Sequence, residues 1–253
     1  MFQTELREIV SLLKFSQYVV AFTGAGISTA SGIPDFRSPE SGLWNDPNAL
    51  QAASLMGFRQ NPRSFYEWVR PLATKLFQAV PNRAHEALAQ LEASNHLQAI
   101  ITQNIDRLHQ KAGSNIVFEL HGNIETATCT HCLQHFDVNV IRAVIEAQQV
   151  DVPLCPTCHN VIKPDVILFG EELPFAPFQK SKQAAQKADF MFILGTSLEV
   201  APASDLPKIS FRNGAKLVVI NNQPTPLDAL AFHVIRAKVD EVLPEIAQLL
   251  GAI

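Results

Sequence analysis

Residues 18–28 read Tyr-Val-Val-Ala-Phe-Thr-Gly-Ala-Gly-Ile-Ser, an apolar run that leads into a glycine-rich turn. A run of consecutive apolar residues is typical of a strand that is buried on both faces. Three further runs of this kind lie at 97–102, 190–194 and 217–220, and most of the four end in small or polar residues. We predict that these segments are strands of one sheet.

Helical stretches separate these predicted strands, for example 85–91 and 179–187. The chain also opens with helical spacing of apolar residues over 6–13. Continuous apolar strands that alternate with helices indicate an α/β fold with a parallel sheet covered on both faces. Because ligands of such sheets bind outside the carboxyl ends of the strands, the polar segments after the strands should converge on one cleft.

The composition is that of an ordinary globular protein of 253 residues, with 47% hydrophobic and 17% charged residues. A formal net charge of −4 argues against a general nucleic-acid binder, which usually carries a basic face. No apolar run approaches the roughly 20 residues of a membrane span, and residues 1–5 lack the basic region of a secretory signal. We expect no membrane partner and no direct nucleic-acid partner.

The four cysteines form two Cys-x-x-Cys pairs, Cys129/Cys132 and Cys155/Cys158. This spacing is typical of a ribbon that holds one tetrahedral Zn²⁺ through four thiolates, and a closed set of four ligands indicates a structural metal. The alternatives are redox-active dithiols or unrelated thiols. Paired cysteines in a chain without a secretory signal favour a reducing compartment, so we expect a cytoplasmic protein.

The glycine run Gly24-Ala25-Gly26-Ile27-Ser28 follows a strand, where backbone N–H groups can approach a pyrophosphate. The match to the dinucleotide fingerprint G-x-G-x-x-G is incomplete, because Thr29 occupies the place of the third glycine. The alternative interpretation is an ordinary tight turn.

Two other polar segments are candidates for ligand contacts. The segment 31–38 holds Asp35, Phe36 and Arg37 beside glycine and proline, which fits a loop that covers a ligand; the alternative is a surface turn with an Asp35–Arg37 ion pair. Gln103-Asn104-Ile105-Asp106 ends a strand, where an amide and a carboxylate can hold ribose hydroxyls or a carboxamide. The alternative there is helix N-capping.

The interpretation of two further motifs depends on which residues surround them in the fold. Phe169-Gly170-Glu171 can add a peptide as an extra strand, although the pattern alone favours a core strand that ends in a glycine turn. His121 in Leu120-His121-Gly122 has a side chain whose ordinary pKa lies near neutrality, so it is a candidate general base.

Taken together, these motifs resemble the sirtuin family of NAD-dependent protein deacylases, over about residues 18–244. The resemblance implies a Rossmann-like large domain of 1–33, 81–125 and 162–253. It also implies a small lobe made of a cofactor loop with a helical insert, 34–80, and a four-cysteine zinc-binding module, 126–161. Further matching segments are Gly195-Thr196-Ser197-Leu198, Ile220-Asn221 and Asp240-Glu241-Val242-Leu243-Pro244.

The resemblance implies NAD⁺ as a consumed co-substrate, one structural Zn²⁺, and acyl-lysine proteins or peptides as partners. His121 would be the general base and Asn104 would orient the ribose or a water. Phe36 would shield the reacting carbon. Contacts to NAD⁺ would come from Gly24, Ala25, Gly26, Ser28, Ile33, Asp35, Phe36, Arg37, Gln103, Asn104, Ile105, Asp106, Gly195, Thr196, Ser197, Asn221, Asn222 and Val239. Contacts to the peptide would come from Val166, Phe169, Gly170 and Glu171.

The implied reaction converts acyl-lysine and NAD⁺ into free lysine, nicotinamide and O-acyl-ADP-ribose. One departure concerns the acyl group: relatives that favour succinyl- or malonyl-lysine carry Tyr-x-x-Arg, whereas Tyr66 is followed by Val69 and Arg70 comes one residue late. Since one residue turns a helical side chain by about 100°, we predict a preference for neutral acyl groups.

The nearest alternative is NAD-dependent protein mono-ADP-ribosylation on the same fold. A non-catalytic NAD or ADP-ribose sensor and a zinc-ribbon nucleic-acid module are weaker alternatives. We expect the protein to be a monomer.

Overall fold

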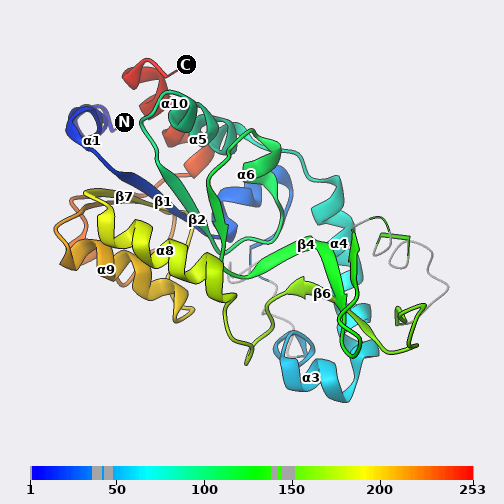
Figure 1. Cartoon of the computed structure of the whole chain (residues 1–253). Coiled ribbons are helices and arrows are strands. Elements are labelled where there is room, and N and C mark those ends of the chain that lie inside the picture. The colour runs from blue at the N-terminus through cyan, green and yellow to red at the C-terminus, as the bar shows by residue number, and fades with distance from the viewer. Residues whose placement is uncertain are drawn as a thin grey trace.

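The computed structural model describes residues 2–35, 42, 48–137, 139, 142–143 and 152–252. In Figure 1 a helix-covered sheet occupies one part of the molecule, and a smaller lobe with β4, β6, α3 and α4 stands beside it. The two chain ends lie close together above the sheet.

Six of the described strands form one sheet in the order β3-β2-β1-β7-β8-β9. Every neighbouring pair in this sheet is parallel, which confirms the predicted sheet. The order reverses at β1, so the carboxyl ends of β1 and β7 form the crevice where such folds bind ligands. The bounds are β1 Val19–Thr23, β2 Ala99–Thr102, β3 Val117–Glu119, β7 Phe190–Leu194, β8 Lys216–Ile220 and β9 His233–Ile235.

Helices cover both faces of this sheet, and the strand residues alternate between the two resulting cores. Val19 and Ala21 of β1 pack with one set of helices, whereas Val20 and Phe22 pack with the other. This is why the central strands are apolar at nearly every position rather than at every second one. The first set is α1 Gln3–Phe15, α5 Arg83–Ala93 and α10 Val239–Leu250, and the second is α8 Phe175–Lys187 and α9 Leu206–Arg212.

The smaller lobe has its own sheet and its own core. Its strands are antiparallel in the order β5-β4-β6. Phe58, Phe65 and Tyr66 are buried in contact with one another and anchor the third cluster of apolar side chains. The bounds are α2 Ala49–Ala52, α3 Leu55–Gln60, α4 Pro62–Gln78, β4 Gly122–Cys129, β5 His135–Asp137 and β6 Ile162–Val166.

Short helices connect these elements. The glycine run that follows β1 continues directly into the 3-10 helix η1, Ala25–Ser31. The others are α6 Leu108–Lys111, η3 Ala203–Asp205 and η4 Asp228–Leu230.

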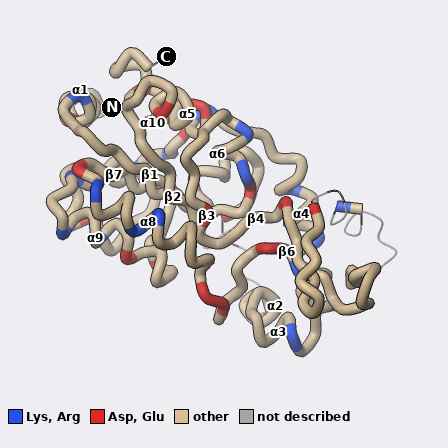
Figure 2. The backbone as a smooth tube through the Cα atoms, in the orientation of Figure 1, with Lys and Arg blue, Asp and Glu red and all other residues tan. Residues whose placement is uncertain are grey.

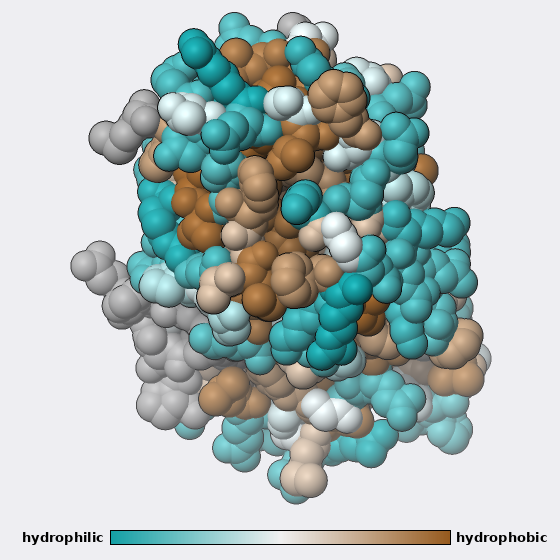
Figure 3. All heavy atoms as spheres, turned by 90° about the vertical axis from the view of Figure 1, so that its left-hand side faces the viewer, coloured by the Kyte–Doolittle hydropathy of each residue, from teal (hydrophilic) through white to brown (hydrophobic). Residues whose placement is uncertain are grey.

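Charged residues of both signs are interspersed over the outer helices, while β1, β2 and β7 carry none (Figure 2). Figure 3 shows one side of the molecule, where hydrophobic surface lies across the middle of a largely hydrophilic face. In the part of the chain that the structure describes, no helix combines the length and apolar character that crossing a membrane requires.

Candidate active site

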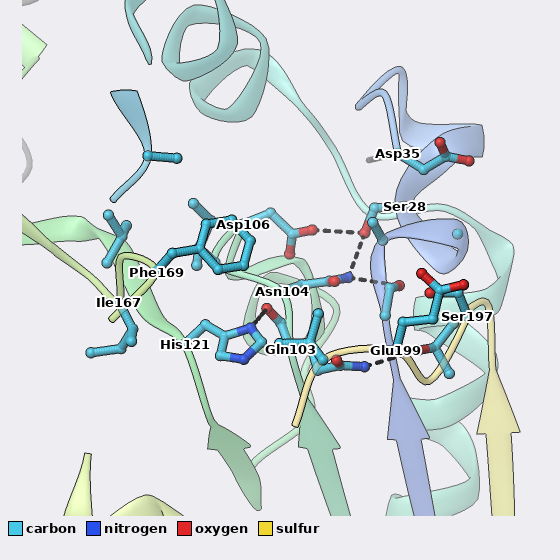
Figure 4. Close-up of a pocket in the computed structure, with 18 of the residues that line it drawn as sticks. Ser28, Asp35, Gln103, Asn104, Asp106, His121, Ile167, Phe169, Ser197 and Glu199 are labelled. Atoms are coloured by element: carbon cyan, nitrogen blue, oxygen red, sulfur yellow. Dashed lines mark hydrogen bonds between the residues drawn. The ribbon is translucent and has the colours of Figure 1, made fainter. Parts of the chain in front are cut away.

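A cavity of about 550 Å³ opens at the carboxyl ends of β1, β2 and β7. This volume lies in the ordinary range for cofactor sites. In Figure 4, Ile167, Phe169 and His121 lie at one end of the view and Ser197 and Glu199 at the other, with Asn104 between them. Predicted residues that line it are Gly24, Ala25, Gly26, Ser28, Ile33, Asp35, Gln103, Asn104, Ile105, Asp106, His121, Val166, Phe169, Gly170, Glu171, Gly195, Thr196, Ser197 and Asn221.

Two glycines allow the turns after β1 and β7 to touch each other. The N–H of Gly26 donates to the carbonyl oxygen of Gly195 at 2.8 Å. A Cβ on Gly26 would lie 2.8 Å from the Cα of Gly195, and a Cβ on Gly195 would lie 2.3 Å from the backbone nitrogen of Ile27. Only glycine fits this close approach, which leaves a smooth backbone surface that a pyrophosphate can reach.

Asn104 is held in a buried polar network. Its Nδ2 donates to the carbonyl oxygen of Gly24 and to Oγ of Ser28, both at 3.1 Å. Both amide protons are thus used inside the protein. No hydrogen bond to its Oδ1 occurs among the residues that the structure describes, so this oxygen is the acceptor left for a ligand.

Asp106 completes this network from the other side. One carboxylate oxygen accepts from the Ser28 hydroxyl at 2.7 Å and the other accepts from the N–H of Leu108 at 2.9 Å. Burial raises the pKa of the Asp106 carboxyl, and these hydrogen bonds oppose the rise. The N-cap position of α6 is Arg107, which makes no side-chain cap hydrogen bond, so neither Asn104 nor Asp106 is the N-cap; Asp106 instead accepts from the first N–H of the helix.

His121 presents one ring nitrogen as a base. Its Nδ1 lies 3.0 Å from the carbonyl oxygen of Gln103, and a carbonyl only accepts, so Nδ1 carries the proton. The lone pair of Nε2 is then available in the cavity that His121 lines. Burial lowers the pKa of His121 below 6.5, although the hydrogen bond to Gln103 opposes this shift. The ring is consequently neutral at pH 7 and able to accept a proton.

The four cysteine thiols converge in the smaller lobe. All four sulfur atoms lie within 4.8 Å of one another, with Cys129 and Cys158 3.4 Å apart and Cys132 and Cys155 3.6 Å apart. Neighbouring sulfurs of a tetrahedral zinc site are separated by about this distance, because each Zn–S bond measures about 2.3 Å. The donor set fits Zn²⁺ and lies outside the residues that line the cavity.

The Phe169-Gly170-Glu171 segment lines the cavity, and part of it is already paired. The N–H of Phe169 donates to Ala53 and its carbonyl accepts from Leu55, both at 2.9 Å. The carboxylate of Glu171 accepts from the N–H of Leu168 at 2.7 Å and lies 3.0 Å from the ammonium of Lys163. The Glu171 side chain therefore shapes this loop.

Two predicted cofactor contacts, Asn222 and Val239, do not line the cavity, and two others are not among the described residues. Asn222 borders a separate pocket of about 430 Å³ beside α10, and Val239 is the buried first residue of α10. Phe36 and Arg37 lie outside the described residues.

Apart from Val69, which the acyl-group prediction named, sequence reasoning missed the wall of the cavity that α4 supplies. Five side chains from α4 line it, and their spacing is that of one helical face. The signal was present in the sequence as an amphipathic pattern over 62–78, but that pattern does not reveal which neighbour the face covers. These residues are Phe65, Trp68, Val69, Leu72 and Leu76.

The sheet is doubly wound and parallel, and it has a glycine turn at its switch point and a neutral histidine in the crevice. These features define an α/β protein of the dinucleotide-binding class. The separate four-thiol site adds a structural metal module. The model of the Sir2 family matches residues 24–202. The chain belongs to the Sir2 family.

Relatives and solved structures match nearly the whole chain. A "NAD-dependent protein deacetylase" of Sulfurisphaera tokodaii is 45% identical over 95% of this chain and 94% of its own length. A "NAD-dependent protein deacylase 2" of Archaeoglobus fulgidus is 41% identical over 97% and 96%. A structure described as "Sir2-p53 peptide-NAD+" is 40% identical, with a TM-score of 0.89, and covers 98% and 99% of the two chains. One of "Sir2Tm bound to a propionylated peptide" is 38% identical, with a TM-score of 0.89, over 98% and 100%.

Proposed function

We propose that this chain is an NAD⁺-dependent protein-lysine deacylase. The observation that carries the proposal is the neutral His121 ring, whose Nε2 is available in the same cavity as Asn104 and the glycine turn. The relatives named deacetylase or deacylase support this activity over mono-ADP-ribosylation. Acyl-lysine peptides are the substrates, and one Zn²⁺ held by four thiolates is the structural metal.

When bound, NAD⁺ supplies the ribose carbon that receives the acyl oxygen as nicotinamide leaves. The Nε2 atom of His121 then accepts a proton from a ribose hydroxyl, because Nδ1 already donates to the carbonyl oxygen of Gln103. Asn104 orients the ribose or a water through Oδ1. Such proton transfer contributes about 10²–10⁴-fold to a rate.

The other predicted site residues contact different parts of NAD⁺ or the peptide. The glycine turn, Thr196, Ser197 and Asn221 hold the phosphates and the adenosine half, as Asn222 and Val239 are also predicted to do. Phe36 and Arg37 cover the nicotinamide ribose together with Asp35. Val166 and Phe169-Gly170-Glu171 contact the peptide. The same proposal includes the division of the chain into a large domain, an insert and a zinc module. It also includes a monomeric state and a cytoplasmic location.

The structure supports neutral acyl groups. Val69 lines the cavity at the position where a carboxylate-binding arginine would lie. The hydroxyl of the buried Tyr66 donates to the carbonyl oxygen of Ile162 at 2.5 Å, so it is engaged inside the small lobe. Burial also raises the pKa of Tyr66, which keeps the phenol neutral.

The test is incubation with NAD⁺ and matched acetyl-, butyryl- and succinyl-lysine peptides, with products followed by mass spectrometry. We expect free lysine peptide and O-acyl-ADP-ribose in equal amounts, and acetyl preferred to succinyl at least tenfold in kcat/KM, on the order of one lost charge-assisted contact. His121→Ala should lower kcat by at least about 10²-fold. Full activity in His121→Ala would refute the assignment of the base, and ADP-ribosylated protein as the main product would refute deacylation.

A further inference from the structure

Two fully buried histidines, His85 and His109, lie behind the Asn104 network. Their rings are in edge-to-face contact with centroids 5.0 Å apart. Neither lines the cavity, and the proposed reaction assigns no task to either. Buried polar rings are costly unless their nitrogens are used, so their hydrogen bonds indicate what they do.

The proton of His85 can be placed from its partners. Nδ1 accepts a hydrogen bond from the N–H of Asn82 at 3.3 Å, as part of the cap of α5, so the proton is on Nε2. Nε2 lies 3.5 Å from Oγ of Ser28. Since the single hydroxyl proton of Ser28 is directed to Asp106, His85 is the donor in this longer contact.

The proton of His109 can be placed in the same way. Its Nδ1 has no partner among the residues that the structure describes, and a proton there would be a buried donor without an acceptor. The proton is therefore on Nε2, which lies 3.0 Å from Oγ1 of Thr23. The Thr23 hydroxyl donates in turn to Oγ1 of Thr102 at 2.8 Å.

The two chains of hydrogen bonds meet at Asn104. Oγ of Ser28 accepts from the side-chain Nδ2 of Asn104 at 3.1 Å. Oγ1 of Thr102 accepts from the backbone N–H of Asn104 at 3.0 Å. We infer that the two buried histidines are positioning residues for Asn104, holding its side chain from one direction and its backbone from the other. This inference rests on the proposed role of Asn104 in deacylation.

The surroundings of both rings keep them neutral, as the two tautomers require. Burial lowers the pKa of His85 to about 4. Burial, and after it the neighbouring His85, lowers the pKa of His109 well below 6.5. Both rings are thus neutral at pH 7, with one donor and one acceptor each.

Substitutions at position 85 can separate helix capping from positioning. His85→Asn keeps an acceptor near the place of Nδ1 for the N–H of Asn82, but its side chain is too short to reach Ser28. His85→Gln is long enough to offer a donor to Ser28 and is a common residue at this position of a capping box. The two variants therefore differ mainly in the contact with Ser28.

The measurement is kcat, KM and NAD⁺ affinity with one acetyl-lysine peptide, together with the melting temperature. We expect His85→Asn to lower kcat about tenfold, as a small displacement of a reacting group does. Its NAD⁺ affinity should stay within about twofold of the wild-type affinity, and its melting temperature should be close to that of His85→Gln. His85→Gln should retain most of kcat. His109→Met should lower kcat about fivefold, whereas His109→Gln, which keeps a donor for Thr23, should lower it less. His96→Gln, on a loop outside the cavity, is the matched control.

A second readout needs neither NAD⁺ nor turnover. In ¹⁵N-histidine spectra of the wild type, assigned by the signals that the variants lose, both rings should remain neutral with the proton on Nε2 from pH 8 to pH 5.5. Rings that protonate near pH 6.5, or carry the proton on Nδ1, would overturn the inference. So would losses of kcat that follow the melting temperatures of the variants. A wild type inactive on every acyl peptide would instead refute the proposed function, and the spectra would still decide the inference.

Discussion

The four thiols of the small lobe come from two Cys-x-x-Cys pairs, whereas the residues that line the cavity are spread along the chain from Gly24 to Pro224. Each cysteine pair is local in sequence, so the thiol site needs only that the two pairs come together, as the Cys129–Cys158 and Cys132–Cys155 contacts show. The cavity requires three strands, a helix of the small lobe and several turns to be correct at once. A site built from local residue pairs can therefore be recognised by the spacing of those residues in the sequence. A site built by a sheet is recognised by the residues at which its strands end.

Loss of zinc should have the largest effect on this molecule. Cys155→Ser removes one of four ligands, and a structural zinc site contributes directly to folding. We expect less than about 0.1 zinc per chain and at least a 10²-fold lower activity, because the lobe that carries α4 loses its anchor. His131→Ala, between Cys129 and Cys132, is the control and should keep one zinc per chain by metal analysis. Zinc retained by Cys155→Ser together with activity would show that the cavity does not depend on the thiol site.

A single methyl group at the sheet switch point should have the next largest effect. Gly26→Ala places a Cβ 2.8 Å from the backbone of Gly195, so one of the two turns must shift. We expect about 2–3 kcal/mol lower stability and at least tenfold weaker NAD⁺ binding by calorimetry. Gly214→Ala is the matched control: its φ is +94°, and apart from its chain neighbours no described residue has a heavy atom within 4 Å of an added Cβ. Only about 1 kcal/mol of backbone strain is therefore expected, with unchanged NAD⁺ affinity. Equal effects of the two substitutions on NAD⁺ binding would contradict the close-approach argument.

The acid limb of the pH–rate profile should report His121. Because burial lowers the pKa of His121, the active, neutral ring predominates at lower pH than for a free histidine. Deacylation kcat/KM should therefore persist to lower pH than a base of pKa 6.5 would allow, and should fall about tenfold per pH unit below the lowered pKa. An apparent pKa above 6.5 in the free enzyme would argue against His121 as the buried base.

The smallest effect is expected in the pH dependence of stability. His85 has a pKa of about 4 when folded, and an ordinary 6.5 when unfolded, so the unfolded chain binds more protons below pH 6.5. Its contribution is complete above pH 6.5 and is lost as the pH falls toward 4, which amounts to about 2 kcal/mol between pH 7 and pH 5. His85→Asn should lose less stability than the wild type over this interval in urea unfolding. Parallel losses would mean that the buried ring does not titrate as its surroundings imply.

Much of the large sheet was predictable from the sequence, and less of the cavity was. The apolar runs of β1, β2, β7 and β8 were recognised because burial on both faces leaves no polar position in them. Two edge strands, β3 and β9, were not, since three residues are too few to show a period. The glycine turn was a weak signal alone, because the need for glycine comes from the opposing turn at Gly195.

The kind of sheet, the four-thiol site, and an amide, a carboxylate and a histidine placed after strands could all be read from the chain alone. The basic nitrogen of His121, the cavity wall that α4 supplies, and the route from His85 and His109 to Asn104 emerged only when the chain was folded. Strand periodicity and ligand spacing are short-range properties of the chain. Proton positions and cavity walls depend on the carbonyls, hydroxyls and side chains that long-range packing brings within hydrogen-bonding distance.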